Sequence, residues 1–199
     1  MLDCINILDQ LNDEQREAVS TVDGPLQIIA GAGSGKTRVL THRIAYLIQQ
    51  GHASLSSILA ITFTNKAAQE MKERVAKLLK LQNTSILWIY TFHAFCARLL
   101  RKNSDQIGLP SNFSILDTVD QRALLKRLAK EAGIDTKMYA PQAIGAIISR
   151  AKNLLQAPKE LLGEPSNPIE RYAIELYPAY QRALAANAAV DFDDLLVKT

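Results

Sequence analysis

The chain has 199 residues, enough for one large domain or two small ones, and 48% of them are apolar, which is enough for a sizeable core. The formal net charge of +3 neither demands nor excludes a nucleic-acid partner. No apolar run is long enough to span a membrane, the N-terminus lacks a secretion signal, and Cys4 and Cys96 give neither a disulfide framework nor a metal-ligand spacing. We therefore expect a cytoplasmic protein.

The first predicted helix begins near residue 11, with Asn12 as its N-cap. Gln15 lies three residues further on, where its side chain can return a hydrogen bond to the Asn12 N–H and complete a capping box. A glutamine amide also matches the donor and acceptor edges of adenine, so a nucleotide contact is the alternative interpretation. The residues by themselves favour the capping box.

A glycine-rich loop follows the short apolar run 26–30, which the sequence predicts to be a buried strand. The residues of this loop are Ala30, Gly31, Ala32, Gly33, Ser34, Gly35, Lys36 and Thr37. A helix is predicted over 38–48, because the apolar residues there share one face. Strand, glycine-rich loop and helix in this order are typical of a phosphate-binding loop, in which backbone N–H groups and the positive end of the helix hold an anion.

This loop predicts a site for a nucleoside triphosphate and Mg²⁺. The ammonium group of Lys36 suits the β- and γ-phosphates, and the hydroxyl of Thr37 suits the metal ion. Ala30 stands where the strict pattern has glycine, which is a tolerated variant. The motif and its context agree, which disfavours the alternative of a plain glycine turn followed by a surface lysine.

Two further strands are predicted at 58–63 and 86–91, both too apolar to have a solvent-exposed face, and each is followed by a helix. Strands that alternate with helices predict an α/β layer fold with a parallel sheet. Ligands of such sheets gather at the carboxyl ends of the strands. The loops expected to share that face are 31–37, 63–66 and 90–93.

The pattern changes at residue 103, after which only helices are predicted. They span about 120–132, 142–155 and 168–187. The second of them carries Leu154 and Leu155 on its apolar face, and Pro178 should kink or split the third. The sequence therefore predicts an α/β domain over 1–102 and a helical domain over 103–199.

Three carboxylates near the end of the chain, on Asp191, Asp193 and Asp194, invite a metal-binding interpretation. A capping role is favoured, because Asp191 can cap a final helix whose positive first turn holds the other two. A magnesium-binding acid of a phosphate-loop enzyme normally ends a buried apolar strand, and no such strand is predicted before these residues.

Four separated blocks of the chain stand in a characteristic order. They are 11–15, the phosphate loop, 60–68 (Ala-Ile-Thr-Phe-Thr-Asn-Lys-Ala-Ala) and 90–93 (Tyr-Thr-Phe-His). Their order and spacing resemble the N-terminal part of UvrD/Rep/PcrA-type superfamily 1 DNA helicases. The phosphate loop alone is common, whereas the Phe-Thr-Asn-Lys-Ala-Ala block is specific. The segment 191–196 resembles the stretch shortly before that family's acidic magnesium motif.

The resemblance implies part of a RecA-like motor domain, followed by an inserted all-helical subdomain. It implies an ATP-dependent 3′-to-5′ DNA helicase that acts on single-stranded DNA and on junctions of single and double strands, in DNA repair or replication. The resemblance is also compatible with partner proteins that load the helicase onto DNA. By the resemblance Gln15 selects adenine, and the phosphates and Mg²⁺ are held by Gly33, Gly35, Lys36, Thr37 and Arg38.

The same resemblance assigns a second set of residues to single-stranded DNA. They are Phe63, Thr64, Asn65, Lys66, Thr91, Phe92 and His93. An aromatic face, polar groups and cations are what single strands require. Without the resemblance, core packing would be preferred for the two phenylalanines, and a polar helix start for His93.

Two positions depart from the family pattern, since Tyr90 stands where many relatives have glycine and Ala94 where they have serine. The chain also lacks the family's acidic pair and later arginine motifs, so we expect the C-terminal remainder of a helicase to complete it, and little ATP hydrolysis without that remainder. The alternatives are the helicase part of a recombinational helicase–nuclease, and a fragment that binds nucleotide and DNA without turnover. A small-molecule phosphate-loop kinase is disfavoured, because it leaves the blocks at 63–66 and 91–93 unexplained.

Overall fold

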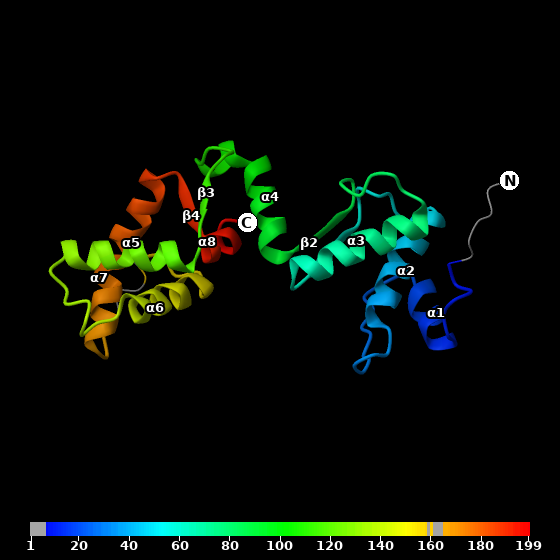
Figure 1. Cartoon of the computed structure of the whole chain (residues 1–199), viewed down its shortest axis with the longest axis horizontal. Helices are drawn as coiled ribbons and strands as arrows, with labels where there is room; N and C mark the ends of the chain where they lie inside the picture. The colour runs from blue at the N-terminus through cyan, green and yellow to red at the C-terminus, as the bar shows by residue number, and fades with distance from the viewer. Residues whose placement is uncertain (1–6, 159, 161–164) are drawn as a thin grey trace. The chain divides into compact units, whose positions relative to one another are not determined.

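The computed structural model describes residues 7–158, 160 and 165–199, so Cys4 lies outside the described residues. The chain divides into two compact units, Met1–Phe92 and His93–Thr199, whose elements are labelled in Figure 1. Among the residues described, no helix is long and apolar enough to cross a bilayer.

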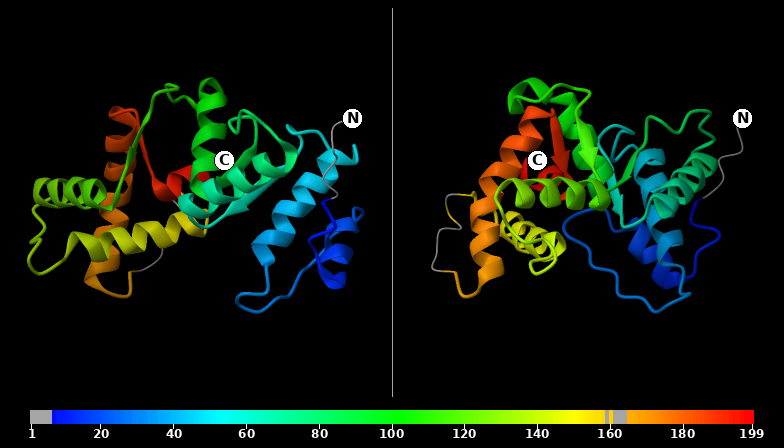
Figure 2. Two further views of the ribbon diagram at one scale, coloured as in Figure 1. Left: turned by 45° about the vertical axis from the view of Figure 1, so that its right-hand side comes forward. Right: turned by 60° about the vertical axis from the view of Figure 1, so that its left-hand side comes forward.

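From residue 7 onward, where the structure describes it, the first unit is built from three helices and a two-stranded sheet. Its elements are α1 (Asp13–Ser20), α2 (Lys36–Gln49), β1 (Leu59–Thr62), α3 (Asn65–Leu79) and β2 (Trp88–Thr91). The strands β1 and β2 pair in parallel, with Thr62 beside Thr91 at their carboxyl ends, which confirms the parallel pairing predicted from their apolar sequences. The helix α3 connects them along the chain and packs beside them (Figure 2). A buried cluster that includes Ile44, Met71 and Ile89 joins α2, α3 and β2.

The prediction of a strand at 26–30 is wrong, because residues 25–30 are irregular. Among the described residues, neither of the two sheets includes this segment, and Ile29 is 90% exposed. A β-strand needs a neighbour to take its backbone hydrogen bonds. The apolar composition of the segment carries no information about whether that neighbour is present.

The second unit contains most of the helices and a second short sheet. Its elements are α4 (Phe92–Lys102, which begins at the last residue of the first unit), η1 (Ser104–Ile107), β3 (Ser114–Leu116), α5 (Thr118–Glu131), α6 (Pro141–Asn153), α7 (Pro168–Ala186), β4 (Ala189–Asp191) and α8 (Phe192–Val197). Because β3 and β4 pair in parallel, with Ser114 beside Ala189, the prediction that this half is all-helical is wrong. Strands of three residues are too short for an alternating pattern to reveal them.

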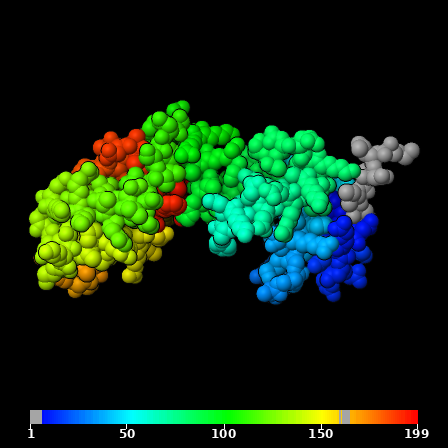
Figure 3. Space-filling view, in the orientation of Figure 1, coloured from blue at the N-terminus to red at the C-terminus, as the bar shows by residue number. Residues whose placement is uncertain are grey.

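Two buried clusters form the core of the second unit. The helices α5, α6 and α7 surround the first cluster, which includes Leu125, Ile144, Ile148, Leu176 and Tyr180. Residues of α4, β4 and α8 pack with Phe113 in the second cluster, which includes Cys96, Leu100, Val190 and Leu195. In the space-filling view, α5 and the segment after it cover much of the near face of the three-helix body (Figure 3).

The helix α4 explains why the compact units divide after residue 92 rather than after 102, where the sequence placed the domain boundary. Its apolar face is buried against β4 and α8, which lie close to the end of the chain. The sequence placed α4 with the strand that precedes it, because the two are contiguous. Its buried contacts are instead made with residues distant in the sequence.

Two details of the helices differ from the sequence prediction. The helix α6 ends at Asn153, so Leu154 and Leu155 lie beyond it and are 60% and 71% exposed. Leu155 takes a left-handed φ of 57°, which a helix cannot continue through. The helix α7 runs as one element through Pro178, so of the two predicted outcomes, a kink or a split, the split does not occur.

Candidate nucleotide and DNA sites

The phosphate-loop candidate forms the turn that leads into α2. Gly33 and Gly35 have φ values of 77° and 88°, a region that is costly for any residue with a Cβ atom. Gly35 is the N-cap of α2, and no side chain caps this helix end. The first N–H groups of α2 therefore remain as donors for an anion.

The Lys36 side chain folds back across the loop. Its Nζ atom donates hydrogen bonds to the carbonyl oxygens of Ala30, at 2.9 Å, and Gly31, at 2.6 Å. The Ser34 hydroxyl also donates to the Gly31 oxygen, at 2.7 Å. The ammonium group thus lies beside the loop backbone, where a phosphate group would replace neutral carbonyls with a stronger, charge-assisted partner.

Gln15 connects α1 to the phosphate loop while it caps α1. Asn12 Oδ1 accepts from the Gln15 N–H at 2.8 Å, and Gln15 Oε1 accepts from the Asn12 N–H at 3.3 Å, which confirms the predicted capping box. Gln15 Nε2 donates to the Ser34 carbonyl at 3.2 Å. The same nitrogen lies 3.0 Å from where a Cβ atom would stand on Gly35, so a side chain at that position would require the Gln15 amide to move by a few tenths of an ångström.

A cavity of about 410 Å³ lies between α1, the segment before the loop and the start of α2. Its lining combines the polar groups of Gln15, Ser34 and Lys36 with the apolar side chains of Ile28 and Val39. This volume and this mixture of groups are typical of small-ligand sites. The two remaining candidates, Thr37 and Arg38, are exposed in the first turn of α2.

In the first unit, the DNA candidates at 63–66 and at 91–92 lie close together at the carboxyl ends of β1 and β2. The rings of Phe63 and Phe92 have centroids 6.3 Å apart and are 91% and 49% exposed. The hydroxyl of Thr91 donates to Asn65 Oδ1 at 3.4 Å. Neither phenylalanine is buried in the core, so the packing interpretation of these two residues is wrong.

The polar DNA candidates Thr64, Asn65 and Lys66 lie at the start of α3, next to the carboxyl end of β1. Thr64 is the N-cap, with its hydroxyl oxygen accepting from the Ala67 N–H at 3.1 Å. Asn65 and Lys66 are exposed in the first turn. On the neighbouring strand, the Tyr90 ring lies under the ammonium group of Lys72 at 4.3 Å from the ring centroid.

His93 is the one DNA candidate that belongs to the second unit. Its ring packs edge-on against the ring of Phe192, with centroids 5.2 Å apart and an interplanar angle of 69°. The structure therefore links His93 to the acidic segment that begins at Asp191, a relationship that the sequence gives no reason to expect.

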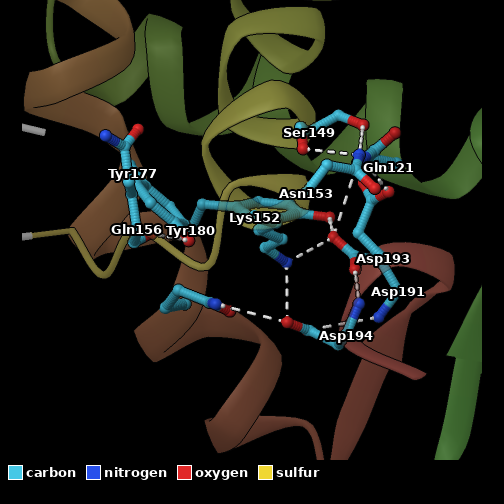
Figure 4. A network of polar contacts seen from close by, with 11 residues as sticks. Gln121, Ser149, Lys152, Asn153, Gln156, Tyr177, Tyr180, Asp191, Asp193 and Asp194 are labelled. Carbon is cyan, nitrogen blue, oxygen red and sulfur yellow. Dashed lines mark hydrogen bonds and ion pairs between the residues drawn. The ribbon is translucent and has the colours of Figure 1, made fainter. Parts of the chain in front are cut away.

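The acidic segment is organised around a buried cation that sequence reasoning missed. Asp191 caps α8 as predicted, because its Oδ1 accepts from the Asp194 N–H at 2.8 Å. Lys152 Nζ lies 2.6 Å from Asp191 Oδ2 and 2.8 Å from Asp194 Oδ1 (Figure 4). Asp191 does end a buried strand, β4, contrary to the sequence prediction, yet its carboxylate is occupied by lysine. The signal was present, since Lys152 follows Ile148 by four residues on the buried face of α6.

Tyr180 completes the surroundings of this cation. Its hydroxyl donates to Asp191 Oδ2 at 2.8 Å, and the Lys152 ammonium lies 5.1 Å from its ring centroid. Burial raises the pKa of the Tyr180 phenol, and the neighbouring Asp191 carboxylate raises it further. The phenol therefore remains a hydrogen-bond donor throughout the physiological range.

Comparison with known proteins shows the family of this chain. The family described as "UvrD/REP helicase N-terminal domain" matches residues 11–199. The chain is 48% identical over 193 residues to the "ATP-dependent DNA helicase PcrA" of Staphylococcus aureus and 50% identical over 193 residues to the protein of that name from Bacillus subtilis. Both matches cover 97% of this chain and 26% of the relative, so the chain spans about a quarter of the length of these relatives. This chain therefore belongs to the UvrD/REP helicase N-terminal domain family.

Proposed function

We propose that this chain is the ATP-binding and single-stranded-DNA-binding part of an ATP-dependent 3′-to-5′ DNA helicase. One observation carries the proposal: the first unit combines an uncapped phosphate loop at the start of α2 with an exposed aromatic and polar edge at the ends of β1 and β2. The first feature suits a nucleotide, and the second suits a single strand. A small-molecule kinase requires only the first.

The nucleotide part of the proposal assigns each group a task. The N–H groups after Gly35 and the ammonium of Lys36 bind the phosphates, and Gln15, which borders the cavity, selects adenine. Thr37 would hold Mg²⁺ through its hydroxyl, which the exposed first turn of α2 allows. When bound, the ion neutralises charge on the phosphate oxygens. In the described part of the chain, no group of three or more histidine, cysteine, aspartate or glutamate side chains is placed to hold a metal.

The DNA part of the proposal rests on exposure. Bases stack on aromatic rings that solvent can reach, and Phe63 is almost fully exposed. Lys66 adds a cation in the adjacent helical turn, and cations beside such rings follow the phosphate backbone. The 3′-to-5′ polarity, the preference for junctions and the loading partners are proposed from the family alone.

Two binding measurements on the purified chain test the proposal. We expect it to bind a non-hydrolysable ATP analogue in the presence of Mg²⁺ and, independently, an oligothymidylate measured by fluorescence anisotropy. Phe63→Ala should weaken binding of the oligonucleotide and leave the affinity for the ATP analogue unchanged. Nucleotide binding without any affinity for the oligonucleotide would contradict the DNA part and favour another class of phosphate-loop protein.

A further inference from the structure

Lys152 is a buried cation shared by two carboxylates at the start of α8. The side chains of Lys152, Asp191 and Asp194 are 1%, 2% and 2% exposed. Gln121 donates a further hydrogen bond to Asp191 Oδ2 at 3.5 Å (Figure 4). Gln181 donates one to Asp194 Oδ1 at 3.3 Å. Nearly every polar atom of the group therefore has a partner, which is the condition under which buried charges define one arrangement.

The same two carboxylates are the caps of α8. Asp191 and Asp194 form a reciprocal capping box, so Lys152 bonds to both sides of the box at once. The neighbouring residue on α6, Asn153, donates to Asp193 Oδ1 at 3.2 Å. A helix of six residues is not stable by itself. The end of α6 therefore holds the first turn of α8, together with the packing of Leu195 in the second cluster and the bonds from Tyr180 and Gln181 of α7.

The first turn of α8 presents one aromatic ring outward. Phe192 lies between the capping residues Asp191 and Asp194 in the chain and is 45% exposed. The carboxylates of those two aspartates, by contrast, are buried against Lys152. The Phe192 ring is the one that packs edge-on against the His93 imidazole in the first turn of α4. A change in the direction of the α8 turn would move this ring and release the imidazole.

We propose that Lys152 is a positioning residue for the DNA contact of His93. It acts through Asp191 and Asp194, which hold the first turn of α8, and through Phe192, which orients the imidazole. This inference rests on the proposed function, because that function assigns His93 to single-stranded DNA. The lysine itself is buried and touches no ligand.

The His93 ring signals test the positioning without DNA. The chain has three histidines, so His93→Ala assigns the imidazole resonances in a proton–carbon NMR spectrum, and Phe192→Ala gives their position without the neighbouring ring. We expect Lys152→Met to move the His93 resonance at least halfway to its position in Phe192→Ala. The His42 and His52 resonances should stay in place, as should the His93 resonance in the control variant Lys126→Met, which changes an exposed residue of α5.

A second variant covers the case in which Lys152→Met does not fold, as judged by its circular dichroism. The double variant Lys152→Met/Asp194→Asn removes one charge of each sign, so it buries one carboxylate without a cation rather than two, while it still breaks the link from Lys152 to α8. It should give the same displacement of the His93 resonance. A folded variant of either kind with an unchanged His93 resonance would overturn the proposal.

Binding of oligothymidylate separates the positioning from the proposed function. We expect Lys152→Met to weaken binding by about the same factor as His93→Ala, roughly 2- to 10-fold for one hydrogen-bonding group. The variant that combines both substitutions should lose no more than either alone, because the lysine acts through the histidine. If the resonance moves but His93→Ala binds DNA normally, the DNA role of His93 fails and the positioning stands. If His93→Ala weakens binding and the resonance of Lys152→Met does not move, the positioning fails and the DNA role stands.

Discussion

The side-chain amide of Gln15 donates a hydrogen bond of 3.2 Å to the carbonyl oxygen of Ser34. Through this bond the residue that completes the capping box of α1 also contacts the phosphate loop. The two interpretations that the sequence offers for Gln15 are therefore compatible, because one amide group serves the helix end and borders the proposed nucleotide site.

Substitution of Gln15 separates these two tasks. Gln15→Ala should lower the stability of the first unit by about 1 kcal/mol, the usual value of a capping interaction, and reduce the preference for ATP over GTP. Asn12→Ala is the matched control, since it breaks the same capping box and leaves the Gln15 amide in place. Equal loss of ATP preference in both variants would mean that Gln15 acts only through the cap. Nucleotide titrations and urea unfolding provide the measurements.

Lys36→Ala should weaken binding of ATP more than binding of AMP. The proposed function assigns this ammonium to the outer phosphates, and each charge-assisted hydrogen bond contributes roughly 1.5–3 kcal/mol. Lys77→Ala, which removes an exposed cation from the last turn of α3, is the control. The measurement is titration of each variant with ATP and with AMP. An equal loss of affinity for the two nucleotides would show that Lys36 does not reach the outer phosphates.

Lys66→Ala should weaken binding of single-stranded DNA without changing the nucleotide affinity. Removal of one phosphate contact should flatten the slope of log affinity against log salt concentration by about 0.7 for a single strand. The measurement is anisotropy of a labelled oligothymidylate over a series of salt concentrations, again with Lys77→Ala as the control. An unchanged slope would mean that Lys66 is an exposed residue of α3 that makes no contact with the DNA backbone.

His42 should make the stability of the first unit depend on pH. Its ring is buried, its Nδ1 atom lies 2.8 Å from the Arg38 carbonyl oxygen, and among the described residues its Nε2 atom has no hydrogen-bond partner. Burial lowers the pKa of His42 below 6.5, outweighing the bond to the Arg38 carbonyl, which raises it. The folded state therefore binds its proton less readily than the unfolded state does, so the free energy of unfolding should fall as the pH drops below about 6.5.

Trp88 is the only tryptophan of the chain and lies in β2, so its fluorescence reports urea unfolding of the first unit. The fall in stability between pH 7.5 and pH 5.5 should be smaller in His42→Gln than in the unsubstituted protein. His52→Gln, which changes an exposed histidine of the same unit, should retain the full dependence. If His42→Gln retains it too, the titrating group is another one.

The sequence by itself determined the features that depend on neighbours along the chain. The glycines of the phosphate loop, the start of α2 and the capping boxes at Asn12 and Asp191 each involve residues within a few positions of one another. Propensity, periodicity and capping act over that range. The shared edge at the carboxyl ends of β1 and β2 followed from the apolar strand patterns, whereas the exposure of Phe63 and Phe92 there did not.

Only the tertiary structure decided which segments found distant partners. The apolar run 26–30 has the sequence of a strand but is irregular, whereas residues 114–116 form the strand β3 although their sequence predicts none. The reason is that a strand exists only where another strand lies beside it. Lys152 is a buried cation because two carboxylates some forty residues later fold back onto it. Hydrogen bonds between strands and ion pairs across helices depend on spatial proximity that the local pattern does not encode. The sequence can place Lys152 on the buried face of α6, but its carboxylate partners, like the partners of the strands, could be identified only in the folded chain.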